Sequence, residues 1–233
     1  MNDAPFAPDF ADAIVRSSPN SGERKGESPV DILLLHYTGM ESAAAALEHL
    51  CDAGARVSAH YVIDEDGTVI SLVAEDKRAW HAGEAYWRGE TDINGRSVGV
   101  ELVNPGHQFG YRGFPDPQMA VLAHLAKEIQ TRHSIPPRNI VGHSDISPRR
   151  KIDPGELFDW EWLAGMGVGL WPKFPGTFKK SGPSVEVMLE EIGYETISRD
   201  ATIMAFQRHF RPQRHQKGYP ANDRECPGAE NDA

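Results

Sequence analysis

The sequence predicts an α/β protein in which a mixed central β-sheet carries helices on both faces. Short apolar runs, typical of buried strands, alternate along the chain with stretches of helical periodicity. A length of 233 residues is enough for one good-sized core and a short helical C-terminal appendage. The hydrophobic fraction of 39% is ordinary for a soluble protein, and no apolar stretch approaches the roughly 18 residues of a membrane span.

In the first half of the chain, each expected element depends on a local signal. Pro, Ser, Asn and Gly are frequent before residue 28, which favours an irregular arm. Unbroken apolar runs predict buried strands, and the Asp66-Gly67 pair suits a hairpin turn. Ser42 can cap a helix that Gly54 would stop. The expected elements are an arm with a short helix near 10–15, strands over 30–37, 60–64, 68–73 and 97–103, a helix over 42–51, and a long loop over 80–95.

The second half is mainly helical. Apolar residues recur over four turns from Asp116, and Pro136-Pro137 ends this helix. A short strand over 139–142, a helix over 156–163 and two capped helices over 184–192 and 200–210 follow. The expected divisions are an arm (1–27), a main domain (28–165), a linker (166–183), a helical segment (184–212) and a disordered tail (213–233).

Charge and cysteine content exclude several classes of protein. A formal net charge of -10 argues against binding nucleic acid through its phosphates. A substrate carboxylate would need a local basic patch, for which Arg149, Arg150 and Lys151 are candidates. Cys51 and Cys226 are too far apart in sequence for a disulfide framework or a metal knuckle. The N-terminus has no basic and apolar export signal, so we expect a cytoplasmic location.

Three residues form a candidate zinc site. His36 ends an apolar strand, and His143 and Asp153 lie at the two ends of a loop rich in Pro and Gly that can fold back on itself. A catalytic zinc site uses three protein ligands and leaves a fourth position for water. A single His at a strand end is more often a structural residue, so the prediction needs further support from the surrounding sequence.

Six motifs supply that support. They are Leu34-Leu35-His36-Tyr37-Thr38, Ser58-Ala59-His60-Tyr61-Val62-Ile63, Trp80-His81-Ala82-Gly83, Ser97-Val98-Gly99-Val100-Glu101, Gly142-His143-Ser144-Asp145 and Lys151-Ile152-Asp153-Pro154-Gly155. In this order they resemble the zinc N-acetylmuramoyl-L-alanine amidases of the type 2 family, which also includes phage lysozyme-like amidases and peptidoglycan-recognition proteins. The resemblance covers about residues 28–165 and implies the family's fold and one Zn²⁺ per chain.

The resemblance also implies two catalytic residues. Glu101 lies in an apolar strand, where a carboxylate is expensive to bury without a partner, and it occupies the position of a Glu in the family's recycling enzymes. We expect it to move the proton of the attacking water; the alternative is an outward-facing Glu on an edge strand. Lys151 matches the family's Lys-x-Asp-Pro-Gly motif and would stabilise the oxyanion. The alternative for Lys151 is a solvated basic loop.

Further residues are candidates for contacts to the substrate. These are Tyr37, His81, Arg149 and Arg150. Tyr37 stands where the recycling enzymes commonly have Asn, which leaves selectivity for the anhydro sugar open. Asp145 is expected either to orient an imidazole or to cap its loop.

The resemblance implies a zinc hydrolase that cuts the amide bond between N-acetylmuramic acid and the L-alanine of the stem peptide. Its substrate would be a muropeptide or peptidoglycan fragment, including 1,6-anhydro forms from cell-wall turnover. The helices after residue 184 resemble a three-helix peptidoglycan-binding module without its third helix, and such a small unit could not fold alone. A non-catalytic peptidoglycan-recognition protein and a zinc acylase for another N-acyl amino acid are the alternatives.

Overall fold

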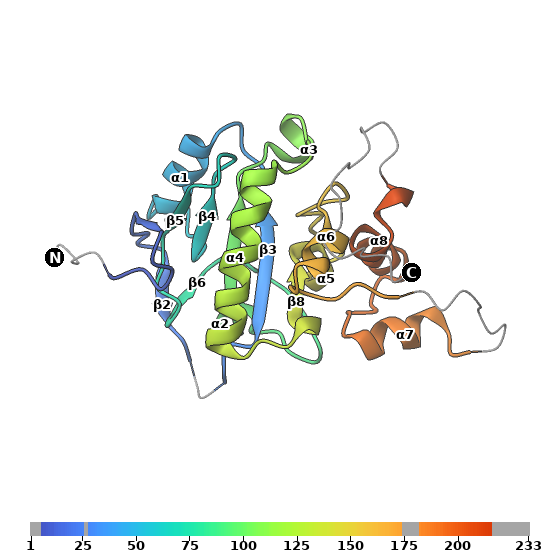
Figure 1. The fold of residues 1–233 in the computed structure, drawn as a ribbon. Coiled ribbons are helices and arrows are strands. Elements are labelled where there is room, and N and C mark those ends of the chain that lie inside the picture. Colours follow the sequence, from blue (N-terminus) through green and yellow to red (C-terminus); the bar gives the residue numbers. More distant parts are fainter. Residues whose placement is uncertain (1–5, 26–27, 174–181, 216–233) are drawn as a thin grey trace, which may run out of the picture.

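A six-stranded mixed sheet with the strand order β1-β5-β4-β7-β3-β8 forms the centre of the molecule (Figure 1). The computed structural model describes residues 6–25, 28–173 and 182–215. The strands of the six-stranded sheet are β1 (Ile14–Val15), β3 (Ile32–Tyr37), β4 (Tyr61–Ile63), β5 (Val69–Ser71), β7 (Ser97–Leu102) and β8 (Ile140–Gly142), and β2 (Ser21–Glu23) pairs with β6 (Lys77–Ala79) in a separate antiparallel sheet. In the six-stranded sheet β5 runs antiparallel to β4, whereas the other neighbouring strands are parallel.

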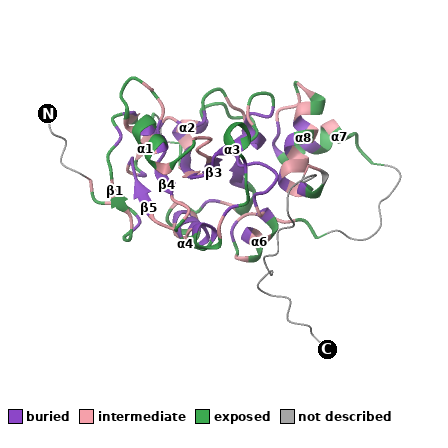
Figure 2. Ribbon diagram, turned by 90° about the horizontal axis from the view of Figure 1, so that it is seen from above, coloured by how far each residue is buried: buried purple, intermediate pink, exposed green. Residues whose placement is uncertain are grey.

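Helices cover both faces of this sheet, as Figure 2 shows. The α-helices are α1 (Ala43–Cys51), α2 (Ile93–Arg96), α3 (Gly106–Phe109), α4 (Asp116–His133), α5 (His143–Ile146), α6 (Trp160–Gly165), α7 (Val185–Ile192) and α8 (Arg199–Phe210), and the 3₁₀ turns are η1 (Pro137–Asn139) and η2 (Pro212–Arg214). The predicted mixed sheet with helices on both faces is confirmed. Among the described residues, no helix combines the length and the hydropathy needed to span a membrane.

The alternation of side chains along the central strands decides which face carries the chemistry. Leu33 and Leu35 of β3 pack in the core formed with α4. Ile32 and Leu34 pack on the opposite face, with α2 and α5. Because side chains of a strand alternate between faces, His36 points to the side of Ile32 and Leu34. The apolar run therefore brings an imidazole to the carboxyl end of a central strand.

The neighbouring strand β7 adds a carboxylate to the same face. It lies parallel to β3, with Gly99 opposite Leu34 and Glu101 opposite His36. Paired residues of parallel strands point to the same side of the sheet, so Glu101 and His36 are neighbours. The alternative in which Glu101 lies on an edge strand is wrong, because β7 lies between β4 and β3.

Two predicted helices differ in the structure. The helix expected near residues 10–15 is absent: Ile14 and Val15 instead form the edge strand β1, which pairs with β5. The helix expected over 156–163 starts only at Trp160, since Asp159 caps it by accepting a hydrogen bond from the Trp162 N–H at 2.9 Å. Gly155 adopts a φ of 88°, and turns occupy the residues between it and the helix.

Other helix boundaries follow the sequence closely. Ser42 caps α1 through the Ala45 N–H, and Ser184 caps α7 through the Val187 N–H. The first helix ends at Cys51, as expected, because Asp52 is already extended. The last helix, α8, begins after Ser198, whose side chain makes no capping hydrogen bond.

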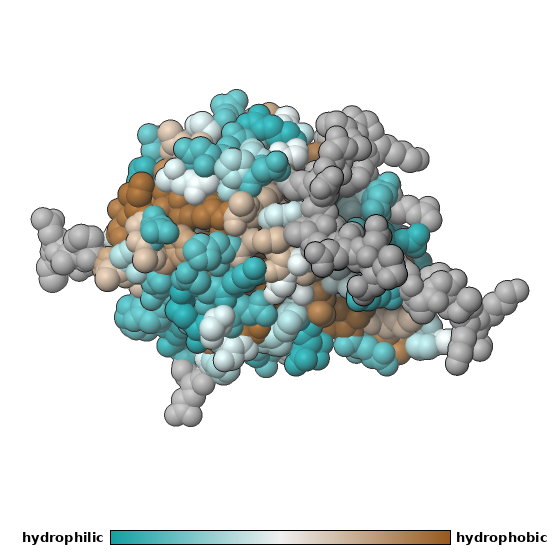
Figure 3. Space-filling view, in the orientation of Figure 1, coloured by the Kyte–Doolittle hydropathy of each residue, from teal (hydrophilic) through white to brown (hydrophobic). Residues whose placement is uncertain are grey.

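Residues 174–181 of the predicted linker and nearly all of the predicted tail, with Cys226, lie outside the described residues. The two C-terminal helices pack against the main domain, beside α5 and α6 at the right of Figure 1. Their inner side contributes Leu189, Tyr194 and Ala205 to the core that contains Ile32 and Leu34. Their outer side is apolar surface, visible at the lower right of Figure 3.

A buried carboxylate ties the turn before β6 to the end of α4. Glu75 is 2% exposed and accepts hydrogen bonds from the Tyr61 hydroxyl (2.6 Å), Arg132 (2.7 Å) and His133 (2.6 Å). Burial alone would raise the pKa of Glu75, but the hydrogen bonds from His133, Arg132 and Tyr61 outweigh it and lower the pKa to about 2. The ionised carboxylate therefore stabilises the folded state.

We expect the substitution Glu75→Gln to lower the free energy of unfolding at pH 7 by about 3 kcal/mol, because a buried charge network loses its anion. The folded-state pKa of about 2 lies below the unfolded value, which is about 4.3. The contribution is therefore present above about pH 4.3 and lost as the pH falls towards about 2. Urea denaturation at several pH values measures it. The control Glu23→Gln, in an exposed pair with Lys77, should change little; an equally small effect of Glu75→Gln would contradict the assignment.

Candidate metal and active site

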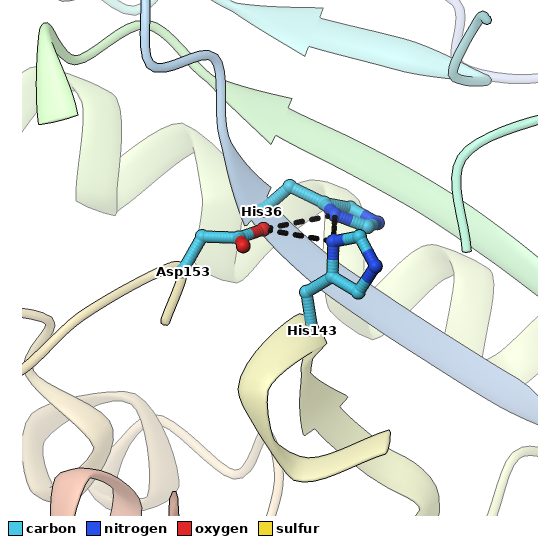
Figure 4. A group of neighbouring side chains, drawn as sticks. All are labelled: His36, His143 and Asp153. Atoms are coloured by element: carbon cyan, nitrogen blue, oxygen red, sulfur yellow. Dashed lines mark hydrogen bonds and ion pairs between the residues drawn. The ribbon is translucent and has the colours of Figure 1, made fainter. Parts of the chain in front are cut away.

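Three side chains that are remote in sequence converge on one point (Figure 4). His36 reaches it from the end of β3, His143 from the start of α5, and Asp153 from the loop that follows. The two Nδ1 atoms are 2.9 Å apart, and each lies 3.1 Å from the same carboxylate oxygen, Oδ2 of Asp153. All three residues are buried. The predicted loop does fold back, because the Ser144 N–H donates to the Asp153 carbonyl at 2.9 Å.

The outer nitrogens of both imidazoles have other partners. Nε2 of His143 lies 3.0 Å from the Ala82 carbonyl, which can only accept, so this nitrogen carries the hydrogen. Nε2 of His36 lies 3.1 Å from Nδ1 of His81 and donates to it in the matching tautomer. Both Nδ1 atoms then present lone pairs towards the carboxylate of Asp153. Three acceptors face one another, which is the arrangement that a bound cation stabilises.

The protonation states suit a cation. Burial, helped by the charge of His143, lowers the pKa of His36 to about 4, so this imidazole is neutral at pH 7. Burial alone would raise the pKa of Asp153, but the two histidines hold it well below its usual range. The group thus offers two imidazole nitrogens and one negative oxygen, a donor set that fits a divalent metal.

Glu101 lies beside this group without a hydrogen-bond partner for its buried Oε2 atom among the described residues. Burial raises the pKa of Glu101 well above its usual range; the charge of Asp153 adds to this effect and Lys151 opposes it. A carboxylate with a raised pKa, held next to a metal site, is suited to taking up and releasing a proton.

A cavity of about 350 Å³ opens beside this group, with His143 and Asp153 in its wall. Of the residues that the sequence predicted for catalysis and substrate contact, Glu101, Lys151, Tyr37, His81 and Arg150 line it. Arg149 does not: its guanidinium points away and pairs with Glu195 at 2.7 Å. Arg150 is held by the carbonyl oxygens of Ala82 and Glu84.

His81 lines the cavity and also contacts His36, since its Nδ1 lies 3.1 Å from Nε2 of His36. Its Nε2 is 3.4 Å from the Ser97 hydroxyl, and burial, followed by the charges of His36 and His60, lowers its pKa well below the usual range. This ring therefore supports a ligand. His60 supports the sheet in turn by accepting from the Gly99 N–H at 2.9 Å.

Asp145 caps its own helix. Its Oδ2 accepts from the Gly142 N–H at 2.7 Å, and its carboxylate reaches no ligand imidazole. Of the two expectations for Asp145, the structure shows the cap, and the imidazole that its carboxylate contacts is that of His209, not that of His36 or His143.

One residue of the cavity wall has no motif around it. His107 Nδ1 lies 3.0 Å from the Tyr37 hydroxyl, and the His107 ring stacks on Tyr111. A His that follows Pro105-Gly106 gives no periodic or spacing signal, so only the fold reveals its place. The close approach depends on Gly106, where a Cβ would meet the Tyr37 ring at 2.7 Å.

Comparison with known proteins agrees with this geometry. Residues 26–156 match the family described as N-acetylmuramoyl-L-alanine amidase. N-acetylmuramoyl-L-alanine amidase AmiD of Escherichia coli is 37% identical over 213 residues, which cover 78% of this chain and 75% of AmiD.

Two solved structures are similar over most of this chain. The structure of E. coli AmiD with anhydro-N-acetylmuramic acid-L-Ala-D-γ-Glu-L-Lys has a TM-score of 0.69 and 34% identity, covering 82% of this chain and 85% of that one. AMPDH3 of Pseudomonas aeruginosa in complex with anhydromuramic pentapeptide has a TM-score of 0.70 and 32% identity, covering 85% and 88%.

We expect Gly99→Ala to weaken metal binding although Gly99 is no ligand. A Cβ at this position would lie 2.5 Å from the His81 ring, which must then move away from His36. Loss of such a supporting contact typically costs about 10-fold or more in metal affinity. Chelator competition with added Zn²⁺ measures the dissociation constant. Gly113→Ala, with no atom within 4 Å of the added Cβ, is the matched control. Unchanged affinity in Gly99→Ala would remove His81 from the site.

Proposed function

Because this chain belongs to the family of N-acetylmuramoyl-L-alanine amidases, we propose that it hydrolyses the amide bond between N-acetylmuramic acid and the L-alanine of the stem peptide. The observation that carries the proposal is the convergence of His36, His143 and Asp153 on one point, next to a cavity that His143 and Asp153 line. Glu101 and Lys151 line the same cavity. Non-catalytic recognition would not require this combination of a metal donor set with a buried carboxylate.

Zn²⁺ is the metal that we propose for this site, since two imidazole nitrogens and one carboxylate oxygen are among its common catalytic ligand sets. When bound, Zn²⁺ would act as a Lewis acid and bring the pKa of a water molecule near neutrality. His36 and His143 would hold it through Nδ1, and Asp153 through Oδ2. Their outer hydrogen bonds, to His81 and Ala82, keep both rings oriented.

Glu101 is the proposed general base and acid. It would accept a proton from the attacking water and return it to the amino group of L-alanine as the amide bond breaks. The support for this role is its position opposite His36 on the adjoining strand and its place in the cavity wall. The half-buried Lys151, across the cavity, would donate to the oxygen of the lactyl carbonyl as negative charge develops there.

We propose muropeptides as the substrate class, including fragments with a 1,6-anhydro end. The support comes from the two similar proteins whose structures hold anhydro-muropeptides, AmiD and AMPDH3. Tyr37, Arg150 and His107 border the cavity and are candidates for substrate contact. The cytoplasmic location expected from the sequence stays a prediction.

An assay with two substrates tests the proposal. We expect purified protein with stoichiometric Zn²⁺ to release peptide from anhydro-MurNAc-tripeptide or from intact MurNAc-peptide, and to lose both metal and activity in His143→Ala. Mass spectrometry of the products and elemental analysis measure these outcomes. No release from either substrate would contradict the proposal and favour a zinc acylase for another N-acyl amino acid. Wild-type protein without a bound metal would favour a recognition protein.

We expect Glu101→Gln to lower kcat by about 100-fold or more, because general acid-base catalysis contributes at least this much. Metal content should stay at the wild-type level, since Glu101 is outside the ligand group. Steady-state kinetics and elemental analysis on the same preparation separate the two effects. Glu48→Gln, on the exposed side of α1, is the control for removing a carboxylate. Full activity in Glu101→Gln would exclude the proposed role.

A further inference from the structure

The C-terminal helices share a core with the metal-binding face of the sheet. Tyr194, which follows α7, packs edge-on against Trp87 with ring centroids 5.2 Å apart. The same hydrophobic cluster contains Ala205 of α8, Leu34 of β3 and Ile146 of α5. The helix that presents His143 is thus clamped between the sheet and the C-terminal segment.

Asp145 is the point at which this segment holds α5. Its Oδ1 accepts from the Tyr194 hydroxyl at 2.6 Å, and its Oδ2 accepts from His209 Nδ1 at 2.7 Å and from the Gly142 N–H at 2.7 Å. Asp145 and Tyr194 are each 1% exposed and His209 is 4% exposed. A carboxylate this deeply buried needs all of its hydrogen bonds. Two of the three come from beyond residue 190.

Aromatic packing fixes the position of the His209 ring. It stacks on Trp160 with a centroid distance of 3.7 Å and an interplanar angle of 16°, and on Phe210 with 4.0 Å and 10°. The ring therefore cannot turn without unstacking, and its Nδ1–H stays aimed at Asp145. The preorganised donor is held by the last turn of α8 and the start of α6 together.

We propose that Tyr194 and His209 are positioning residues of the metal site. They hold the Asp145 carboxylate, which fixes the junction between Gly142 and α5, and this junction aims Nδ1 of His143 at the metal. The inference depends on the proposed function only in taking the three-ligand group as a metal site. The helical segment after residue 184 is accordingly a part of the catalytic domain.

The same segment also reaches the other wall of the cavity. Arg208, on the helix turn next to His209, lies 4.0 Å from Glu156, and both side chains are largely buried. Glu156 accepts from Nε2 of His107 at 3.2 Å, and Nδ1 of that ring faces the Tyr37 hydroxyl at 3.0 Å. The last turn of α8 thereby supports both His143 and a residue that borders the substrate cavity.

The test compares two buried tyrosines with the same chemistry. Tyr194→Phe and Tyr61→Phe each remove a hydroxyl that donates to a buried carboxylate at 2.6 Å. Both variants should lose similar thermal stability, but Tyr61 contacts Glu75 on the α4 side of the sheet. We expect only Tyr194→Phe to weaken Zn²⁺ binding to the metal-free full-length protein, by about 10-fold, and to change the visible spectrum of the Co²⁺-loaded protein. Neither measurement uses substrate, so a failure of the amidase assay leaves them interpretable.

Two further measurements test the same proposal independently. Amide hydrogen exchange in metal-free protein should speed up at α5 in Tyr194→Phe and in His209→Gln, and stay at the wild-type rate there in Tyr61→Phe. In an Asp145→Asn background, adding Tyr194→Phe should have less effect on metal affinity than it has alone, because the two residues act through one contact. Equal metal affinity and equal α5 exchange in Tyr194→Phe and Tyr61→Phe would overturn the proposal, whether or not the wild type cleaves muropeptides.

Discussion

The centre of this protein is organised around three hydrogen-bond acceptor atoms that cannot donate to one another. The Nδ1 atoms of His36 and His143 and the Oδ2 of Asp153 lie about one hydrogen-bond length apart, away from bulk water. Their mutual repulsion is relieved by a cation, and their orientation depends on partners on the far side of each ring. Three features fix the orientation of these side chains. They are the register of β3 and β7, the loop that folds back through Ser144 and Asp153, and the absence of a Cβ at Gly99 beside His81.

The sequence predicted the three residues of the candidate metal site better than it predicted the residues that hold them in place. His36, His143 and Asp153 each occur in a short motif that can be recognised directly in the sequence. The His81 ring can occupy its position because Gly99 has no Cβ. Neither the motif around His81 nor the motif around Gly99 indicates this contact on its own. The partners of Asp145 lie 49 and 64 residues away, so neither local spacing nor periodicity connects them.

The secondary structure also contains elements that the sequence predicts and elements that it does not. The long helix from Asp116 and the buried strand before His36 have strong periodic patterns, and the structure has both. The two-residue strand β1 was missed because its only evidence is the edge of β5 that it pairs with. The start of α6 was placed too early because an apolar pattern does not reveal the turns that Gly155 begins.

The placement of His209 also bears on the order in which this protein matures. Chains are synthesised from the N-terminus and domains can begin to fold before synthesis is complete. His36 and Glu101 leave the ribosome before residue 209. The Asp145 carboxylate, two residues after His143, can accept its hydrogen bond from His209 only after residue 209 has emerged. The sheet can form while its candidate metal-binding corner still lacks that brace, so the three-residue group reaches its final geometry only after α8 has packed against α5.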